Sequence, residues 1–369
     1  MRNDTTATAT ATAARRPASQ LPREPITGNQ LPKWTWALCL ALGLGIAAGL
    51  LLLLGTYSPP GTLVLGVLLF LVLVTVVSAA VEGPRPARDR LAKYTVTSFF
   101  LLALVPLGSL LFEVVRRGAE RFDITFFTET QANTHLMNVE LGAMHALVGT
   151  LLITALAFLI SVPIGLFTAI YLVEYGARTR LAAGIRFLVD VMTGIPSIVA
   201  GLFAYALFSM ILGPGTKSGL AGAVALSVLM IPTVVRSTEE MLKLVPNELR
   251  EASYALGVPK YRTILKVVLP TSLAGIVTGV ILGIARIIGE TAPLLVTAGY
   301  FQLLNTNPFS GPTSTLPVMV YQSLRTHGPR AEEMQALGWA GALTLIILVM
   351  GLNLIGRFIA WKFAPKQGR

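Results

Sequence analysis

The chain has 369 residues, of which 54% are hydrophobic and only 13% carry a charged side chain, and its mean hydropathy is +0.70. Soluble domains carry roughly 25% charged residues, so this composition excludes an ordinary soluble protein and indicates a membrane protein. The net charge is +11, but the basic residues lie between long apolar runs, where they act as topology signals; we expect no nucleic-acid partner. Cys39 is the single cysteine, which excludes a disulfide framework.

Residues 1–33 are rich in Ala, Thr and Pro and show no apolar periodicity, which predicts a disordered cytoplasmic tail. Eight apolar runs follow, each long enough to cross a bilayer as a helix in contact with membrane lipid. These runs are 34–54, 61–81, 94–112, 141–173, 187–212, 218–235, 271–298 and 334–356. The sequence therefore predicts an all-α polytopic membrane protein with eight transmembrane helices.

The basic residues between these runs are unevenly distributed. If the N-terminus lies in the cytoplasm, the cytoplasmic segments hold 22 of the 29 Lys and Arg residues, the outer segments hold six, and Arg286 lies in the membrane. Short loops rich in Lys and Arg stay in the cytoplasm. Both termini are therefore expected inside, with residues 113–140 forming a sizeable extracytoplasmic loop.

The cytoplasmic loop 236–270 separates the sixth and seventh runs and contains its own short helix. Pro246 and Asn247 predict the start and cap of this helix, and Gly257 with Pro259 predicts its end. Two interpretations follow from the pattern alone. The helix is either a solvated connector or an element that docks into a groove on a soluble partner.

This loop resembles the EAA signature of bacterial ABC importer permeases, which reads Glu-Ala-Ala, three residues, Gly, nine residues, Ile, one residue, Leu-Pro. Glu251, Ala252 and Gly257 match it, as do Leu269 and Pro270. Two positions depart conservatively: Ser253 replaces the second Ala, and Val267 replaces Ile. The resemblance implies that the loop is a coupling helix. In that family the coupling helix fits a cleft of an ATP-binding subunit and transmits nucleotide-driven motion to the membrane helices.

The adjoining stretches narrow the resemblance to the phosphate permeases of that family. These stretches are 171–175, 196–199, 201–203, 241–246, 254–257 and 286–295. The resemblance covers residues 110–360, and the last six spans are expected to form a type I importer core, with residues 141–360 as its main transmembrane domain. Residues 34–112 hold three helices, the first two of which are extra to that core.

The resemblance also implies partners in a bacterial inner membrane. They are a second permease subunit, a dimer of ATP-binding subunits that binds ATP and Mg, and an extracytoplasmic phosphate-binding protein. The chain itself contains no Walker A sequence, no metal-binding motif and no nucleophile motif. We therefore expect no enzyme activity, no catalytic residue and no cofactor on this chain.

Arg286 and Glu290 lie inside the seventh run, where a charge costs about 2.5 to 3.5 kcal/mol. In a continuous helix they share a stripe about 80° wide with Gly275, Gly279 and Gly283. The two charges form either an ion pair that joins helices or an anion path. In the path, the guanidinium of Arg286 binds a tetrahedral oxyanion and Glu290 positions it.

Three further residues are candidates, and the first two have two readings each. Arg236, at the end of the sixth run, is a snorkelling residue or an exit-side contact for phosphate. Ser197 either donates a hydroxyl to substrate or packs helices. Asp190 is expected to pair with Arg186, four residues earlier.

Two alternative functions remain open from the residues. One is a permease for another oxyanion such as molybdate or phosphonate, because a single arginine does not distinguish tetrahedral anions. The other is a secondary transporter driven by an ion gradient, in which Glu290 and Asp190 titrate.

Overall fold

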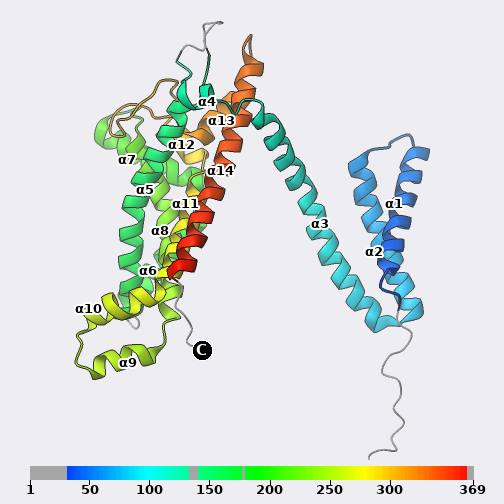
Figure 1. Cartoon of the computed structure of the whole chain (residues 1–369), viewed down its shortest axis with the longest axis horizontal. Helices are drawn as coiled ribbons and strands as arrows, with labels where there is room; N and C mark the ends of the chain where they lie inside the picture. The colour runs from blue at the N-terminus through cyan, green and yellow to red at the C-terminus, as the bar shows by residue number, and fades with distance from the viewer. Residues whose placement is uncertain (1–30, 133–139, 177–178, 364–369) are drawn as a thin grey trace, which may run out of the picture. The chain divides into compact units, whose positions relative to one another are not determined.

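The computed structural model describes residues 31–132, 140–176 and 179–363 (Figure 1). Nearly all of the expected cytoplasmic tail, 1–33, lies outside the described residues. The chain divides into two compact units, Met1–Ser109 and Leu110–Arg369. The long helix α3 (Pro84–Ala119) contributes to both.

The first unit is a pair of packed helices followed by the beginning of α3. Its helices α1 (Thr35–Leu53) and α2 (Pro59–Val81) lie side by side (Figure 1). They approach closely because Gly43 has no side chain: a Cβ there would lie 2.7 Å from the carbonyl oxygen of Gly66. In the middle of α2, the ring of Phe70 meets that of Tyr94 edge to face at 5.5 Å and joins α2 to α3.

The second unit is a bundle built around one buried helix. Its helices are α4 (Ile124–Thr128), α5 (Met144–Ile170), α6 (Arg180–Gly194), α7 (Ser197–Leu212), α8 (Gly219–Lys243), α9 (Asn247–Ala255), α10 (Lys260–Thr263), α11 (Leu269–Ile287), α12 (Ala292–Thr297), α13 (Leu316–Arg325) and α14 (Ala331–Phe363), with the π-helical segments η2 (Tyr171–Tyr175) and η3 (Ile264–Val268). The central helix is α8, which packs against α5, α6, α7 and α11. Its residues Leu226, Met230 and Val234 lie in the main hydrophobic core.

Seven helical segments of the described chain are long and apolar enough to cross a membrane, and the bent pair α6–α7 makes an eighth crossing if it counts as one span. The expectation of eight apolar spans is confirmed. The fifth span, however, is not the continuous helix that the sequence predicted over 187–212. The axes of α6 and α7 differ by 107°, because Pro196 has no N–H to donate and forces Ile195 into an extended conformation.

The seventh predicted run, 271–298, is also interrupted. Helix α11 ends at Ile287, and the short helix α12 starts only at Ala292. Pro293 at the second position of α12 cannot donate a backbone hydrogen bond to Gly289, which removes one helical bond where the chain breaks. Glu290 therefore lies in a connection between two helices.

The helices α9 and α10 project beyond one end of the bundle, and α14 finishes at this same end (Figure 1). The distribution of Lys and Arg predicts that this end faces the cytoplasm. The fold thus separates a membrane bundle from an exposed pair of short helices.

Candidate coupling and transport site

The predicted coupling helix is α9, which presents an exposed surface. Glu251 and Ala252 are both exposed. The apolar side chains of Leu249, Tyr254 and Leu256 are 42%, 41% and 83% exposed. Apolar side chains gathered on a protruding helix next to a carboxylate form a surface of the kind that docks into a groove.

The end of α9 is set by Gly257. The N–H of Gly257 donates to the carbonyl of Tyr254 at 2.9 Å, and the N–H of Val258 donates to the carbonyl of Ser253 at 3.2 Å. These two bonds form a Schellman motif, which requires a left-handed residue after the helix. Gly257 supplies it with φ of +73°. This is the physical reason for glycine at this position of the signature.

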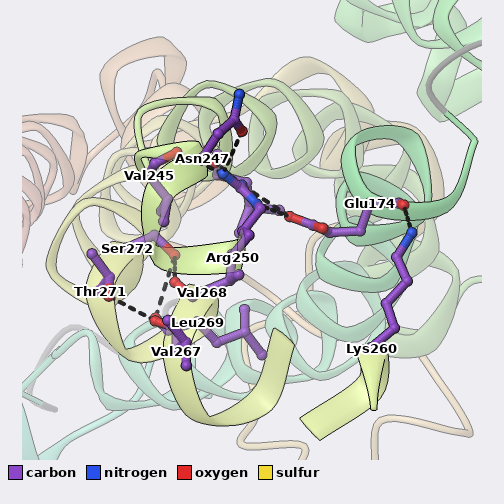
Figure 2. Close-up of polar contacts among 11 residues, drawn as sticks. Glu174, Val245, Asn247, Arg250, Lys260, Val267, Val268, Leu269, Thr271 and Ser272 are labelled. Carbon is purple, nitrogen blue, oxygen red and sulfur yellow. Dashed lines mark hydrogen bonds and ion pairs between the residues drawn. The ribbon is translucent and has the colours of Figure 1, made fainter. Parts of the chain in front are cut away.

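Arg250 fastens α9 to the membrane bundle. Its Nε and Nη2 atoms donate to Glu174 Oε1 at 3.1 and 2.9 Å (Figure 2). Nη2 also donates to the carbonyl of Leu242, and Nη1 donates to that of Val245. The two charged side chains are only 13% and 5% exposed. Sequence reasoning assigned no role to either residue, although Glu174 lies in a stretch that carried the resemblance.

Asn247 does not cap α9 as expected. It is the first residue of the helix, and its side-chain oxygen accepts from Arg250 Nη1 at 3.3 Å (Figure 2). The helix start makes no side-chain cap hydrogen bond. Asn247 therefore orients the anchoring arginine instead of satisfying the helix end.

Two more contacts fix the coupling loop from the α10 side. Lys260 Nζ donates to the backbone carbonyl of Glu174 and lies 4.7 Å from the centroid of the Tyr175 ring. The buried hydroxyls of Ser253 and Thr263 are hydrogen-bonded at 2.8 Å and join α9 to α10. Ser253 departs from the alanine of the signature, and this bond gives the departure a structural role.

Arg286 and Glu290 are brought to the same end of α11 but not onto one helical face. Arg286 is exposed in the last turn of α11, and Glu290 is half-buried in the following connection. Within the described residues no ion pair joins them. The predicted stripe shared by both charges is thus wrong, because the helix stops between them.

The glycines of that stripe do face protein. A Cβ on Gly275 would lie 2.1 Å from the sulfur of Met241, and one on Gly279 would lie 2.3 Å from Ser237 Oγ. Both neighbours belong to α8. The absence of side chains lets α11 approach the central helix, as small residues do at membrane helix interfaces.

Helix α12, which follows Glu290, packs closely against α7. A Cβ on Gly201 of α7 would lie 2.6 Å from Pro293 Cα of α12. Ser197 is the first residue of α7 and is half-buried. The bend that ends α6 therefore places the start of α7 and the start of α12 in one packed layer.

Two ion pairs join α6 to the C-terminal part of α8. Arg236 Nη2 lies 2.5 Å from Asp190 Oδ1. Arg186 Nε lies 3.0 Å from Glu239 Oε1, and Lys243 Nζ lies 2.8 Å from the same oxygen. The expected pair of Asp190 with Arg186 is wrong, because the side-by-side packing of α6 and α8 gives each residue a partner on the other helix. These side chains line a cavity of about 220 Å³.

Comparisons with known proteins identify the family. Residues 161–368 match the binding-protein-dependent transport system inner membrane component family. The phosphate transport system permease protein PstA of Mycobacterium leprae is 46% identical over 294 residues, which cover 77% of this chain and 94% of that protein. This chain belongs to the PstA family of binding-protein-dependent permeases.

A second relative agrees with that assignment. A PstA protein of Yersinia pestis is 40% identical over 283 residues and covers 77% of this chain and 92% of its own length. Among solved structures, the inward-facing MetNI methionine ABC transporter matches with 23% identity and a TM-score of 0.47, covering 61% of this chain and 95% of that one. As a PstA-family permease, the chain is a transport subunit of the bacterial inner membrane.

Proposed function

We propose that this chain passes inorganic phosphate inward as one permease subunit of an ATP-driven importer. The observation that supports this most is α9, an exposed helix outside the bundle that is tied to α5 and η2 through the nearly buried pair of Arg250 and Glu174. Because α9 is fixed to a membrane span, a displacement of α9 would move that span as well. Phosphate is the proposed substrate because the PstA relatives are named as phosphate transport proteins.

The proposed partners follow from the surfaces that the chain leaves open. Leu249, Tyr254 and Leu256 on and beside α9 would contact one ATP-binding subunit of a dimer that holds ATP and Mg. On the opposite membrane face, a phosphate-binding protein would deliver the anion. A second permease would cover α7, whose Phe203 and Met210 are 60% and 79% exposed.

Arg286 is the residue that we assign to the anion path. It is exposed at the end of α11 although it lies in a membrane helix, and a guanidinium donates two parallel hydrogen bonds to a tetrahedral oxyanion. Glu290, four residues later, makes no ion pair with Arg286 in this structure and would hold the guanidinium when the path is shut. Arg236 would contact the anion on the cytoplasmic side by exchanging its Asp190 partner for phosphate, and Ser197 would donate a hydroxyl.

The test is uptake of radiolabelled phosphate into proteoliposomes that hold the whole complex, with ATP supplied on the side of the ATP-binding subunit. We expect uptake that requires ATP, that excess molybdate or sulfate barely reduces, and that Arg286→Gln abolishes while the complex still assembles. Arg357→Gln, the same change at an exposed residue of α14, serves as the matched control and keeps uptake.

Other results would change the assignment. Equal competition by molybdate would support the alternative of a general oxyanion permease. Uptake driven by a pH or sodium gradient without ATP would contradict the importer and favour a secondary transporter. Normal uptake by Arg286→Gln would remove this arginine from the path and leave the importer intact.

A further inference from the structure

The first unit contains a large cavity that the proposed transport path does not use. Its volume is about 870 Å³, and it lies among α1, α2 and the beginning of α3. Most of its wall is apolar and includes Leu40, Leu44, Leu63, Val67 and Leu102. A cavity of this kind at membrane depth accepts hydrocarbon.

One end of this cavity is basic. Lys33 precedes α1, and Arg90 and Lys93 lie in the first turns of α3; all three line the cavity. The aromatic residues Trp36 and Tyr94 line it near the same end. Aromatic and basic side chains gathered at one end of membrane helices are typical of the level of the lipid headgroups.

The basic rim is fixed by one carboxylate. Glu82 Oε1 accepts from the N–H of Leu31 at 2.7 Å and from Arg90 Nη2 at 2.6 Å, while Oε2 accepts from Ser78 Oγ at 2.8 Å. Burial by itself raises the pKa of Glu82, but these hydrogen bonds and the Arg90 charge outweigh it and lower the pKa. The carboxylate stays ionised and joins Leu31, in the segment before α1, to the end of α2 and the first turns of α3.

The carboxylate of Glu82 neutralises the charge of Arg90, but the charges of Lys33 and Lys93 remain. Within residues 31–132, neither Lys33 nor Lys93 forms an ion pair. The ammonium group of Lys93 lies 5.8 Å from the centroid of the Tyr94 ring. Two lysines without a counter-charge therefore lie at the mouth of an apolar cavity. A molecule that complements both the lysines and the apolar wall has an anionic head and a hydrocarbon tail.

We propose that this cavity binds an anionic phospholipid, with its phosphate group between Lys33 and Lys93 and an acyl chain along Leu44, Val67 and Leu102. Basic pockets between membrane helices on the cytoplasmic side bind anionic lipid heads in this manner. An apolar helix of another protein would fill the walls but leave both lysines without a counter-charge. The site is independent of the proposed phosphate path.

The test is native mass spectrometry of the full-length chain in its complex, with phosphatidylglycerol and phosphatidylcholine of identical acyl chains. We expect phosphatidylglycerol to bind more tightly, and Lys33→Ala with Lys93→Ala to weaken it by about fivefold for each lysine removed. The matched control is Arg85→Ala with Arg88→Ala, which removes two exposed charges from the same helix end outside the cavity lining. This control should bind phosphatidylglycerol as the unchanged protein does.

A second pair of variants tests the acyl part. Val67→Trp fills the cavity and should abolish tight binding of phosphatidylglycerol. Val64 lies on the same helix but is 45% exposed, and Val64→Trp should leave that binding unchanged. Excess inorganic phosphate should not displace the lipid, because phosphate has no chain to bury. The proposal is overturned if both lipids bind alike, if the arginine control loses as much affinity as the lysine variant, or if Val67→Trp binds normally.

Discussion

Arg250 and Glu174 lie 76 positions apart in the chain, yet two nitrogens of the arginine donate to one carboxylate oxygen of the glutamate, at 3.1 and 2.9 Å. The arginine belongs to α9 and the glutamate to η2, which continues the membrane helix α5. The carboxylate is 5% exposed. We therefore expect movement of α9 to be passed directly to a membrane span.

Removing this link should release α9. Breaking a buried charge pair by removing one partner costs about 3–5 kcal/mol, since the other charge stays buried and unpaired. We expect Arg250→Ala to abolish copurification of the ATP-binding subunit with this chain and to stop uptake. Arg250→Lys should fail to restore either, because one ammonium cannot reach Glu174 and the carbonyls of Leu242 and Val245 together.

Arg262→Ala is the control for that prediction. Arg262 is exposed in the same loop, and its guanidinium lies over the ring of Tyr261 at 5.7 Å. If Arg262→Ala lowers copurification as much as Arg250→Ala, then net charge in the loop, and not the anchor, holds the partner.

The effect of a substitution at Gly257 should depend only on how well the new residue adopts the left-handed backbone conformation. A Cβ there would meet no atom within 4 Å, but φ is +73°. The left-handed conformation costs an L-residue about 1–2 kcal/mol, less for Asn. We expect binding of the ATP-binding subunit to fall in the order Gly, Asn, Ala, Val, while membrane insertion is unchanged. Equal binding by the Gly257→Val protein would contradict the proposed docking surface.

Gly201→Ala should destabilise the bundle. Its Cβ would lie 2.6 Å from the backbone of Pro293, and overpacking of this kind costs about 1–3 kcal/mol. The expected result is a lower apparent Tm in detergent and reduced uptake, because α12 and the Glu290 connection must move. Gly184→Ala in α6, where a Cβ meets nothing within 4 Å, should keep both values.

The two ion pairs between α6 and α8 should differ in strength. Asp190 and Arg236 are 60% and 50% exposed, and such a pair contributes about 0–1 kcal/mol. Glu239 is 11% exposed and accepts from both Arg186 and Lys243. We therefore expect Glu239→Gln to lower the apparent Tm of the complex several times more than Asp190→Asn. Equal shifts would show that burial does not set the strength of these pairs.

Much of the membrane topology could be predicted because bilayer thickness requires long apolar runs. Prolines marked the places where that prediction was incomplete. Pro196 and Pro293 interrupt runs that are apolar throughout, and hydropathy does not detect a missing backbone donor. As a result, the predicted helix face shared by Arg286 and Glu290 does not exist.

The candidate site was predictable where function is carried by local sequence. Glu251, Ala252 and Gly257 lie within seven positions, so their spacing was enough to predict a coupling loop. The anchor of that loop was missed because Arg250 and Glu174 meet only in the folded chain. The same holds for Arg236 and Asp190, which are 46 positions apart.

The 107° bend between α6 and α7 also bears on how the chain enters the membrane during synthesis. The longer of the two has 16 residues and, at about 1.5 Å per residue, reaches about 24 Å, less than the roughly 30 Å of a hydrocarbon core. Neither piece is a stable insertion unit, and the backbone groups at the bend must be shielded from lipid by protein. The helices that shield α7, which are α8 and α12, are translated after it. Residues 180–212 must therefore stay beside the insertion machinery until the ribosome has made most of the remaining chain.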